Sequence, residues 1–133
     1  MKQKSYSEIS YISIREPWVW LIMEGYKDIE NRGRPWKHRG ELLIHASSNQ
    51  QELLEDLEWV EEEHGIIIPK EELNFGAFVG MVDMIDCVDT HSSDWFSGEY
   101  GFVLENPRRI EPIAYKANAG PQKAYEQEIQ ILN

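Results

Sequence analysis

The chain has 133 residues, a formal net charge of −11 and a hydrophobic content of 41%. That length is typical of one domain, and that composition excludes a disordered or membrane-embedded chain. A surface this acidic repels polyphosphate at long range, which excludes general, high-affinity coating of DNA or RNA.

The same features indicate where the protein works. No apolar run approaches the length that spans a bilayer, and residues 1–8 lack the apolar centre of a signal peptide. Cys87 is the only cysteine, so an internal disulfide framework is excluded and a reducing compartment is favoured. We therefore expect a cytoplasmic protein with no membrane contact, with an N-terminal tail over residues 1–10 and a single domain over residues 11–133.

The first predicted elements alternate between strand and helix. Residues 11–14 predict a short strand, and a helix is expected to begin at Pro17 and to end at Gly25. A short extended stretch follows over residues 28–32. Alternating apolar side chains then predict a second strand over residues 41–46.

The middle of the chain predicts one acidic helix and one long strand. The helix is expected to start after a cap at Ser48 and to end at Gly65. Its buried stripe is expected to hold four residues: Leu53, Leu54, Leu57 and Val60. Residues 69–73 predict one helical turn, and residues 77–88 predict the longest strand. Because this strand is apolar on both faces, we expect it at the centre of the sheet.

The last third predicts a loop, two strands and a helix. A polar loop is expected over residues 89–98, and strands are expected over residues 99–106 and 108–113. Pro121 is expected to open the final helix. The buried stripe of this helix is expected to hold three residues: Tyr125, Ile129 and Leu132. Together these elements predict an α+β fold, a small and mostly antiparallel β-barrel with helices packed outside it.

Charge is distributed unevenly along the chain. Residues 52–72 hold nine of the 24 acidic residues, and residues 27–39 hold five of the 13 basic ones. The acidic stretch is expected as a solvated helix face. The basic stretch predicts a local anion site on a molecule that otherwise repels nucleic acid.

Five segments occur in a recognisable order. They are ISIREPW at residues 12–18, GYKDIENR at 25–32, RGELLIHA at 39–46, GMVDMIDC at 80–87 and YGFVLENPR at 100–108. Together they resemble the ASCH domain family, over about residues 12–117. The element Gly25-x-Lys27-x-x-Glu30-x-Arg32 resembles the signature of that family.

The resemblance implies a fold similar to the PUA domain, a small strand-rich pseudo-barrel with a cleft between barrel and helix. It also implies a role in RNA binding, in RNA metabolism or translation-linked regulation. Some small family members look like hydrolases that remove an acyl group from a modified cytidine, and others are linked to RNA cleavage. The resemblance therefore implies RNA or a nucleotide as ligand. Whether the protein also catalyses a reaction depends on the residues of its site.

The charged residues of the signature are the first site candidates. In a regular strand, Glu30 and Arg32 share one face and Lys27 points to the other, but a turn just after Gly25 would let all three converge. Lys27 and Arg32 would then neutralise a phosphate, and Glu30 would accept a proton or a base N–H. The structural alternative is a Glu30–Arg32 ion pair that holds the strand, with Lys27 solvated.

One departure from the family bears on catalysis. In the acyl-cytidine hydrolases, a threonine nucleophile stands three residues after the signature lysine, and Glu30 occupies that position here. A carboxylate does not replace that hydroxyl in the same covalent step. Activation of water by Glu30, with Lys27 stabilising the developing oxyanion, remains the hydrolytic alternative.

Further candidates combine cations with aromatic rings. Arg34, Trp36, Lys37 and Arg39 offer phosphate contacts plus base stacking, and the alternative is a solvated turn with Trp36 packed on the barrel. Trp18 and Trp20 are two residues apart on the predicted helix, so one is expected in the core and the other lining the cleft or covering its edge. The loop residues Trp95 and Phe96 are expected as lid residues.

His45 is a candidate acid or base, with a satisfied core histidine as the alternative. The histidines show no metal-ligand spacing, and Asp83 and Asp86 face opposite ways on a strand, so we predict no metal. No glycine-rich phosphate loop or dinucleotide motif occurs, and no cofactor is expected.

Three functions follow from these candidates. The first is an RNA or nucleotide binder whose cleft is lined by Lys27, Glu30, Arg32, Arg39 and one or more tryptophans. The second is a hydrolase, acting on an acylated cytidine nucleoside or on RNA through Lys27 and Glu30. The third is a protein-interaction module that uses the acidic helix.

Overall fold

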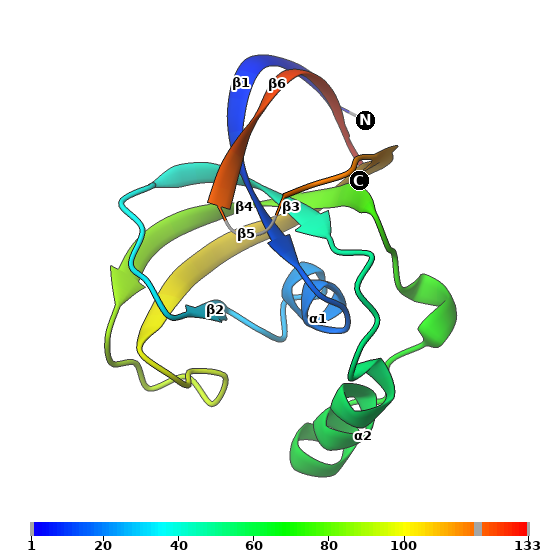
Figure 1. Ribbon diagram of the computed structural model, residues 1–133, viewed down its shortest axis with the longest axis vertical. Helices are drawn as coiled ribbons and strands as arrows, with labels where there is room; N and C mark the ends of the chain where they lie inside the picture. Colours follow the sequence, from blue (N-terminus) through cyan, green and yellow to red (C-terminus); the bar gives the residue numbers. More distant parts are fainter. Residues whose placement is uncertain (1, 119–120, 133) are drawn as a thin grey trace.

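A computed structural model describes residues 2–118 and 121–132. Its elements, in chain order, are β1 (Lys2–Ile14), α1 (Trp18–Met23), β2 (Ile29–Arg32), β3 (Gly40–Ala46), α2 (Leu53–His64), the 3₁₀ turn η1 (Lys70–Glu72), β4 (Ala77–Val88), β5 (Tyr100–Ala114) and β6 (Pro121–Ile131) (Figure 1). The predicted α+β class is confirmed. Residue 1 of the expected tail and residues 119, 120 and 133 of the expected domain lie outside the described residues.

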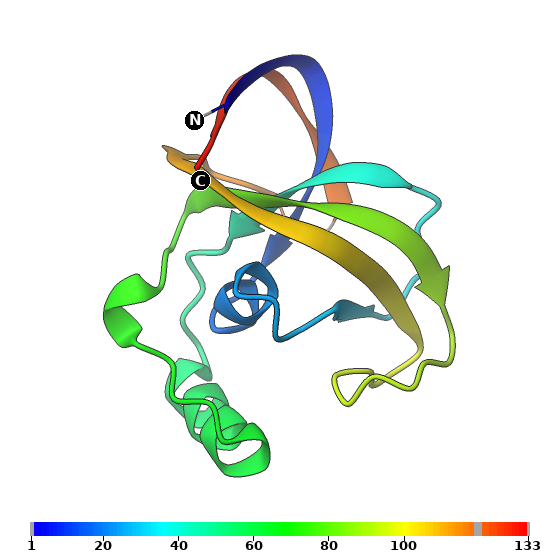
Figure 2. The same ribbon diagram turned by 180° about the vertical axis from the view of Figure 1, so that it is seen from behind.

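The strands form one mostly antiparallel sheet in the order β2-β5-β4-β3-β1-β6. β4 lies between β5 and β3, which confirms the central position predicted from its two apolar faces. The β1–β3 pair is parallel, and the other pairs are antiparallel. A β5–β6 pairing at Ile110 and Ile131 joins the far ends, so that five strands form a hydrogen-bonded ring. Figures 1 and 2 show β1 and β6 as a curved pair that arches away from the other strands.

The predicted final helix is wrong, because the segment from Pro121 is strand β6. Spacing of four residues between Tyr125 and Ile129 fits both a helix and an alternating strand, and pairing with β1 decides between them. Glu126 has a left-handed φ of 53°, and this irregularity buries Ala124 and Ile129 while Tyr125 stays 60% exposed.

The partner of β6 corrects the N-terminal expectation as well. Residues 2–10, expected as a tail, form the first part of β1 and pair with β6 from Lys2 onward. Their polar side chains suit a strand pair with one solvated face. The same polar pattern predicts a tail when the partner strand is not recognised.

Two boundaries also differ from expectation. β5 is one continuous strand, because a left-handed φ of 55° at Asn106 absorbs the break expected at Pro107. α2 begins at Leu53 after Glu52 rather than after Ser48, and Leu54 is 66% exposed rather than part of the buried stripe. Gly65 ends α2 with a φ of 68°, as predicted.

Side chains of alternating direction build two cores on the two faces of the sheet. Leu42 and Ile44 of β3 pack with α1 in one core, while Leu43 packs in a second core that collects side chains from all five strands of the ring. A third cluster, with Leu21 and Val60 at its centre, joins α1 to α2. Both helices therefore lie outside the ring, as predicted, and α2 projects furthest from the sheet (Figure 1).

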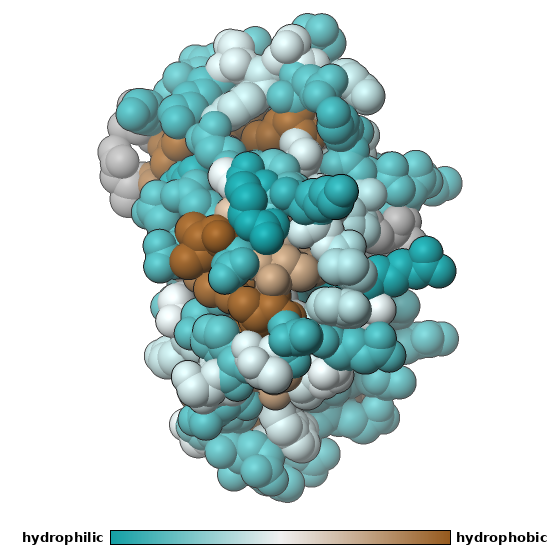
Figure 3. Space-filling view, turned by 90° about the vertical axis from the view of Figure 1, so that its left-hand side faces the viewer, coloured by the Kyte–Doolittle hydropathy of each residue, from teal (hydrophilic) through white to brown (hydrophobic). Residues whose placement is uncertain are grey.

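One side of the protein is largely hydrophilic (Figure 3). Hydrophobic residues interrupt it in patches at mid-height and nearer the top of this view. Within residues 2–118 and 121–132, no helix has the length and apolar character needed to cross a membrane.

Candidate functional site

A cavity of about 600 Å³ opens between α1, β2, α2 and the loop that precedes β5. Its lining residues, which define the central pocket, are Ser13, Ile14, Arg15, Trp18, Lys27, Glu30, Asn31, Arg32, Gly33, Trp59, Asp94, Trp95, Phe96 and Ser97. The three charged residues of the predicted signature lie in it together with Trp18.

The charged floor of the central pocket is a chain of three ionic side chains. Lys27 is 5% exposed, and its Nζ donates to the backbone oxygen of Ile29 and to Glu30 Oε1, the latter at 3.1 Å. The other oxygen of Glu30 accepts from Arg32 Nε at 3.2 Å. Arg32 Nη2 donates to the backbone oxygen of Ser13 at 2.9 Å. The expected Glu30–Arg32 pair is therefore present, but the alternative of a solvated Lys27 is wrong.

A turn after α1 brings Lys27 to the same side as Glu30. Gly25 has a φ of 84°, which favours glycine, and it allows the chain to reverse at the end of the helix. The backbone nitrogens of Tyr26 and Lys27 then donate to the oxygen of Leu21 at 2.9 and 3.0 Å. The chain enters β2 only at Ile29, so the strand alternation that would separate Lys27 from Glu30 does not apply.

Hydrogen-bond donors remain available on this floor. An ammonium has three N–H donors, and the described residues accept two from Lys27. Arg32 Nη1 has no acceptor within residues 2–118 and 121–132. The floor therefore suits a ligand rich in acceptors, such as a carbonyl or a phosphate.

Aromatic side chains form the walls of the central pocket. Trp18 of α1 and Trp59 of α2 meet edge to face, with ring centroids 6.1 Å apart. Trp59 contacts His64 at 5.3 Å, and His64 stacks on Trp95 at 3.8 Å. This row connects α1, α2 and the loop, and it fixes rings from three separate segments around one cavity.

The loop that carries Trp95 is held by polar residues of the signature segment. Asn31 Nδ2 donates to the backbone oxygen of Trp95 at 2.8 Å, and its Oδ1 accepts from the nitrogen of Ser97 at 2.9 Å. Ser93 Oγ donates to Asp28 at 2.7 Å. Residues 27–32 therefore supply the charged floor and also anchor one wall. Trp95 and Phe96 lie in the loop before β5, as expected.

The buried carboxyl group of Glu16 positions the helix that carries Trp18. It accepts from the backbone nitrogens of Trp20 at 2.8 Å and Asn74 at 3.0 Å. Burial raises the pKa of this carboxyl, although the two backbone N–H groups act in the opposite direction. Trp20 is 6% exposed and lies in the core, so the expected division between Trp18 and Trp20 is confirmed.

The other predicted site residues lie elsewhere. Trp36 and Lys37 line a separate cavity, and Arg34 is exposed on the segment between the two cavities. Arg39 pairs with Asp86 at 3.6 Å and does not line the central pocket, contrary to the expected cleft. Gly33 and Pro35 break the strand, so the chain leaves the pocket before these cations are reached.

His45 lies behind the central pocket rather than in it. It is 3% exposed, and its Nε2 donates to the backbone oxygen of Tyr115 at 2.7 Å, while Nδ1 lies 2.9 Å from Ser13 Oγ. Burial lowers the pKa of His45, and the bond to Tyr115 opposes that shift. Because the carbonyl only accepts, the neutral ring carries its proton on Nε2 and accepts from Ser13. The alternative of a satisfied core histidine is the one observed.

Eight lining residues are absent from the sequence prediction, and three of them form contacts that shape the pocket. Asn31 lies inside the signature segment, and a polar residue in the expected extended stretch was its signal. Trp59 lies on the acidic helix, outside the expected apolar stripe, and an aromatic ring on a charged face was its only signal. Ser13 enters through its backbone oxygen, for which the side chain gives no signal. No group of three or more His, Cys, Asp or Glu side chains arranged to hold a metal ion occurs in the described part of the chain.

These observations define a small α+β domain with a strand ring and a pocket at the signature segment. The family model for the ASCH domain matches residues 12–130, nearly the whole chain. The protein therefore belongs to the ASCH domain family, as the five sequence segments indicated. No curated protein matches the chain.

Proposed function

We propose that the central pocket binds a base of RNA or a free nucleotide, and that the described chain, including all of β1, acts as one binding domain. The observation that carries this proposal is the combination of a cationic floor and tryptophan walls in one cavity of about 600 Å³. Small-molecule sites enclose roughly 300–1,000 Å³, and aromatic rings stack on every base because each base has a π-face.

The charges of the pocket support an anionic or acceptor-rich ligand. Three lining residues are cationic (Arg15, Lys27 and Arg32) and two are anionic (Glu30 and Asp94), so this cavity has an excess of one positive charge in a chain of −11. Arg15 is itself paired with Glu52 at 3.6 Å, which leaves the floor as the main source of attraction.

The unused donors of Lys27 and Arg32 also favour some bases over others. Uracil, cytosine and guanine each carry a carbonyl oxygen with two lone pairs, whereas the acceptors of adenine are ring nitrogens with one lone pair each. A donor left without an acceptor in a closed complex costs about 1–3 kcal/mol. We therefore expect pyrimidine nucleotides to bind more tightly than adenosine monophosphate.

The experiment is a titration followed by tryptophan fluorescence and calorimetry. Uridine 5′-monophosphate is compared with adenosine 5′-monophosphate on the parent and on Trp59→Ala, whose indole is 46% exposed and can be removed with little loss of core. Loss of one stacking partner should weaken binding by about 1–3 kcal/mol. Tyr26→Ala is the matched control, since that ring is 51% exposed and lies outside the central pocket.

Equal affinity of the parent, Trp59→Ala and Tyr26→Ala for uridine monophosphate would contradict the proposal. So would an adenosine preference, because a carbonyl acceptor on the base then contributes nothing to binding.

The buried Lys27–Glu30 pair favours one second function, a hydrolase for an acylated cytidine or for RNA. For an acylated cytidine, Glu30 would take a proton from water, the hydroxide would add to the acyl carbon, and Lys27 would stabilise the oxyanion. The acyl C–N bond then breaks, and the amine leaves with the proton. Turnover of acetylated cytidine by the parent and its loss in the isosteric Glu30→Gln would support this function; stable substrate with the parent would remove it.

A further inference from the structure

The protein has a second cavity with aromatic and cationic walls. It measures about 690 Å³ and lies where the segment after β2 passes the start of β6. Its lining residues, which define the side groove, are Ser10, Trp36, Lys37, His38, Pro121, Gln122, Lys123 and Tyr125. None of them lines the central pocket.

Rings in the side groove are suitably held for stacking. Trp36 stacks on His38 with centroids 4.9 Å apart and an interplanar angle of 27°, and Phe102 of the core contacts it at 5.9 Å. His38 is fixed in turn, because its Nε2 lies 2.8 Å from the backbone oxygen of Glu41. Tyr125, 60% exposed, adds a second ring on the β6 side. Ordered rings lose little conformational freedom when a base stacks on them.

The side groove also differs from the central pocket in charge. Two lysines line it and no carboxylate does, whereas Glu30 and Asp94 line the central pocket. Lys123 is neutralised by Glu8 at 2.6 Å. Lys37, and Arg34 just before it, are exposed and form no ion pair with any residue in 2–118 or 121–132. The sequence from residue 32 to residue 40 contains no acid.

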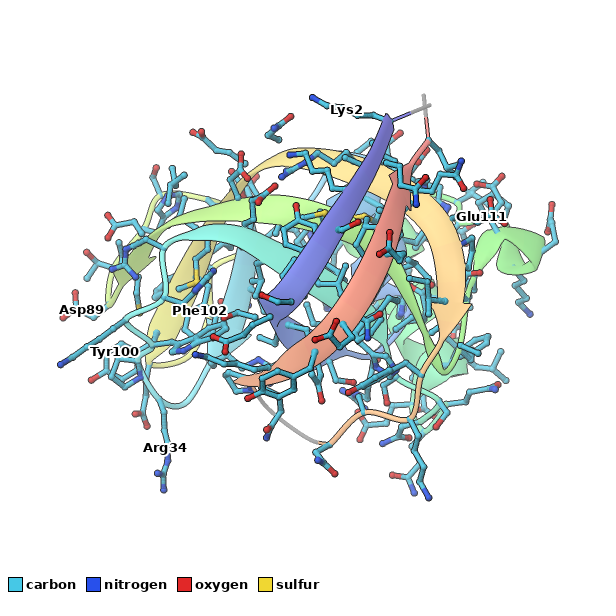
Figure 4. All side chains as sticks on the ribbon, turned by 90° about the horizontal axis from the view of Figure 1, so that it is seen from above. Lys2, Arg34, Asp89, Tyr100, Phe102 and Glu111 are labelled. Atoms are coloured by element: carbon cyan, nitrogen blue, oxygen red, sulfur yellow. The ribbon has the colours of Figure 1, made fainter. Side chains whose placement is uncertain are left out.

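One segment connects the two cavities. Gly33 lines the central pocket and Trp36 lines the side groove, so the two positions are separated by at most about 11 Å of extended chain. Arg34 lies between them and extends away from the body of the protein into solvent (Figure 4). Stacked nucleotides follow one another at about 3.4 Å, so a few of them cover this distance.

We propose that the side groove is a second RNA subsite, which binds the neighbouring nucleotides of a single strand whose base occupies the central pocket. Arg34 and Lys37 contact the phosphates between the two cavities, and Trp36 and Tyr125 stack the next base. This inference rests on the proposed function of the central pocket. It selects single-stranded RNA of several nucleotides over a free nucleotide as the full ligand.

The salt dependence of binding follows from the number of free cations. Each neutralised phosphate of a single strand contributes about −0.7 to the slope of log K against log salt. Two phosphate contacts therefore predict a slope of about −1.4, which is shallow and agrees with a protein that does not coat nucleic acid. Removing Lys37 should reduce the slope by about half.

The test compares uridine 5′-monophosphate with a hexauridylate at several salt concentrations. Lys37→Ala should leave the monophosphate affinity unchanged and weaken hexamer binding about fivefold. Tyr125→Ala should likewise weaken binding of the hexamer and leave the affinity for the monophosphate unchanged. Lys70→Ala is the matched control, because that exposed lysine lies outside both cavities, and it should change neither affinity.

The outcomes separate the two proposals. A hexamer that binds no more tightly than the monophosphate, or equal effects of Lys37→Ala and Lys70→Ala, would overturn RNA binding in the side groove. Base binding in the central pocket would then still stand. A hexamer that is sensitive to Lys37→Ala while no monophosphate binds would retain the groove as an RNA contact and overturn the central pocket. Absence of binding by both ligands would overturn both.

Discussion

Removing Glu30 should destabilise the protein strongly, because it leaves the Lys27 ammonium buried beside a single carbonyl. Lys27 is 5% exposed on its side chain and Glu30 11%. After Glu30→Ala, the only remaining partner of Lys27 in the described structure is the backbone oxygen of Ile29. Loss of Glu30 costs less free energy at Arg32, since Arg32 is 25% exposed and keeps its hydrogen bond to the backbone oxygen of Ser13.

The magnitude follows from burial. Breaking a buried ion pair by removing one partner costs about 3–5 kcal/mol, against about 0–1 kcal/mol for an exposed pair. A domain of this size is stable by about 5–15 kcal/mol. One kcal/mol corresponds to about 3–5 °C in Tm, so Glu30→Ala should lower Tm by about 10–25 °C.

The assay is a urea titration of the parent, Glu30→Ala, Glu30→Gln, Lys27→Met and the double variant Lys27→Met/Glu30→Gln. Lys27→Met should cost less than Glu30→Ala, because the carboxylate keeps Arg32 and the thioether chain fills the space of the lysine stem. The double variant should recover most of the loss, since neither buried charge then remains. The cycle of single and double variants isolates the coupling of the pair.

A free energy of unfolding for Glu30→Ala within about 1 kcal/mol of the parent, the value of an exposed pair, would contradict a buried Lys27–Glu30 pair. So would a double variant less stable than Glu30→Ala, because the cost then does not come from an unpaired charge.

Three further outcomes are expected. Burial lowers the pKa of His45 below its ordinary 6.5, so the unfolded chain takes up a proton at a higher pH than the folded protein does. The free energy of unfolding should therefore decrease as pH falls from about 6.5 through the folded pKa. His45→Gln should remove this part of the pH dependence in urea titrations at pH 5–7.5. Gly101→Ala should destabilise the fold by about 1–3 kcal/mol, because an added Cβ would lie 2.8 Å from Ile29 Cγ1 and 2.9 Å from Phe96 Cδ1. Unchanged thermal stability would show that Ile29 and Phe96 move aside at no cost. Arg32→Gln should weaken nucleotide binding by about 1.5–3 kcal/mol in calorimetry, and unchanged affinity would remove the guanidinium from the site.

The sequence patterns that predicted the fold correctly are those with only one structural solution. Residues 77–88 are apolar on both faces, and such a strand is stable only when neighbours cover both sides, as β5 and β3 do. The segment from Pro121 offers two solutions, because a spacing of four residues suits either period. Pairing with β1, more than 100 positions away, decides for the strand, and local pattern contains no information about that partner.

The same distinction applies to the site. Lys27, Glu30 and Arg32 could be predicted because one turn at Gly25 is enough to bring them together, and residues 25–32 contain that turn. Trp59 could not be predicted, since its position depends on how α2 packs against α1 through Val60 and Leu21. Segment 34–39 was expected in the same pocket, but the break at Gly33 and Pro35 directs it to the side groove.

The central claim is tested most directly by the tryptophan indole N–H signals in a nitrogen-15 NMR titration with uridine 5′-monophosphate. Nucleotide binding should shift the signals of Trp18, Trp59 and Trp95, which line the central pocket, and should cause no comparable shift for Trp20, whose Nε1 donates to Glu72 at 3.0 Å outside it. Unmoved signals at millimolar nucleotide, or a shift of Trp20 as large as that of Trp18, would contradict nucleotide binding in the central pocket.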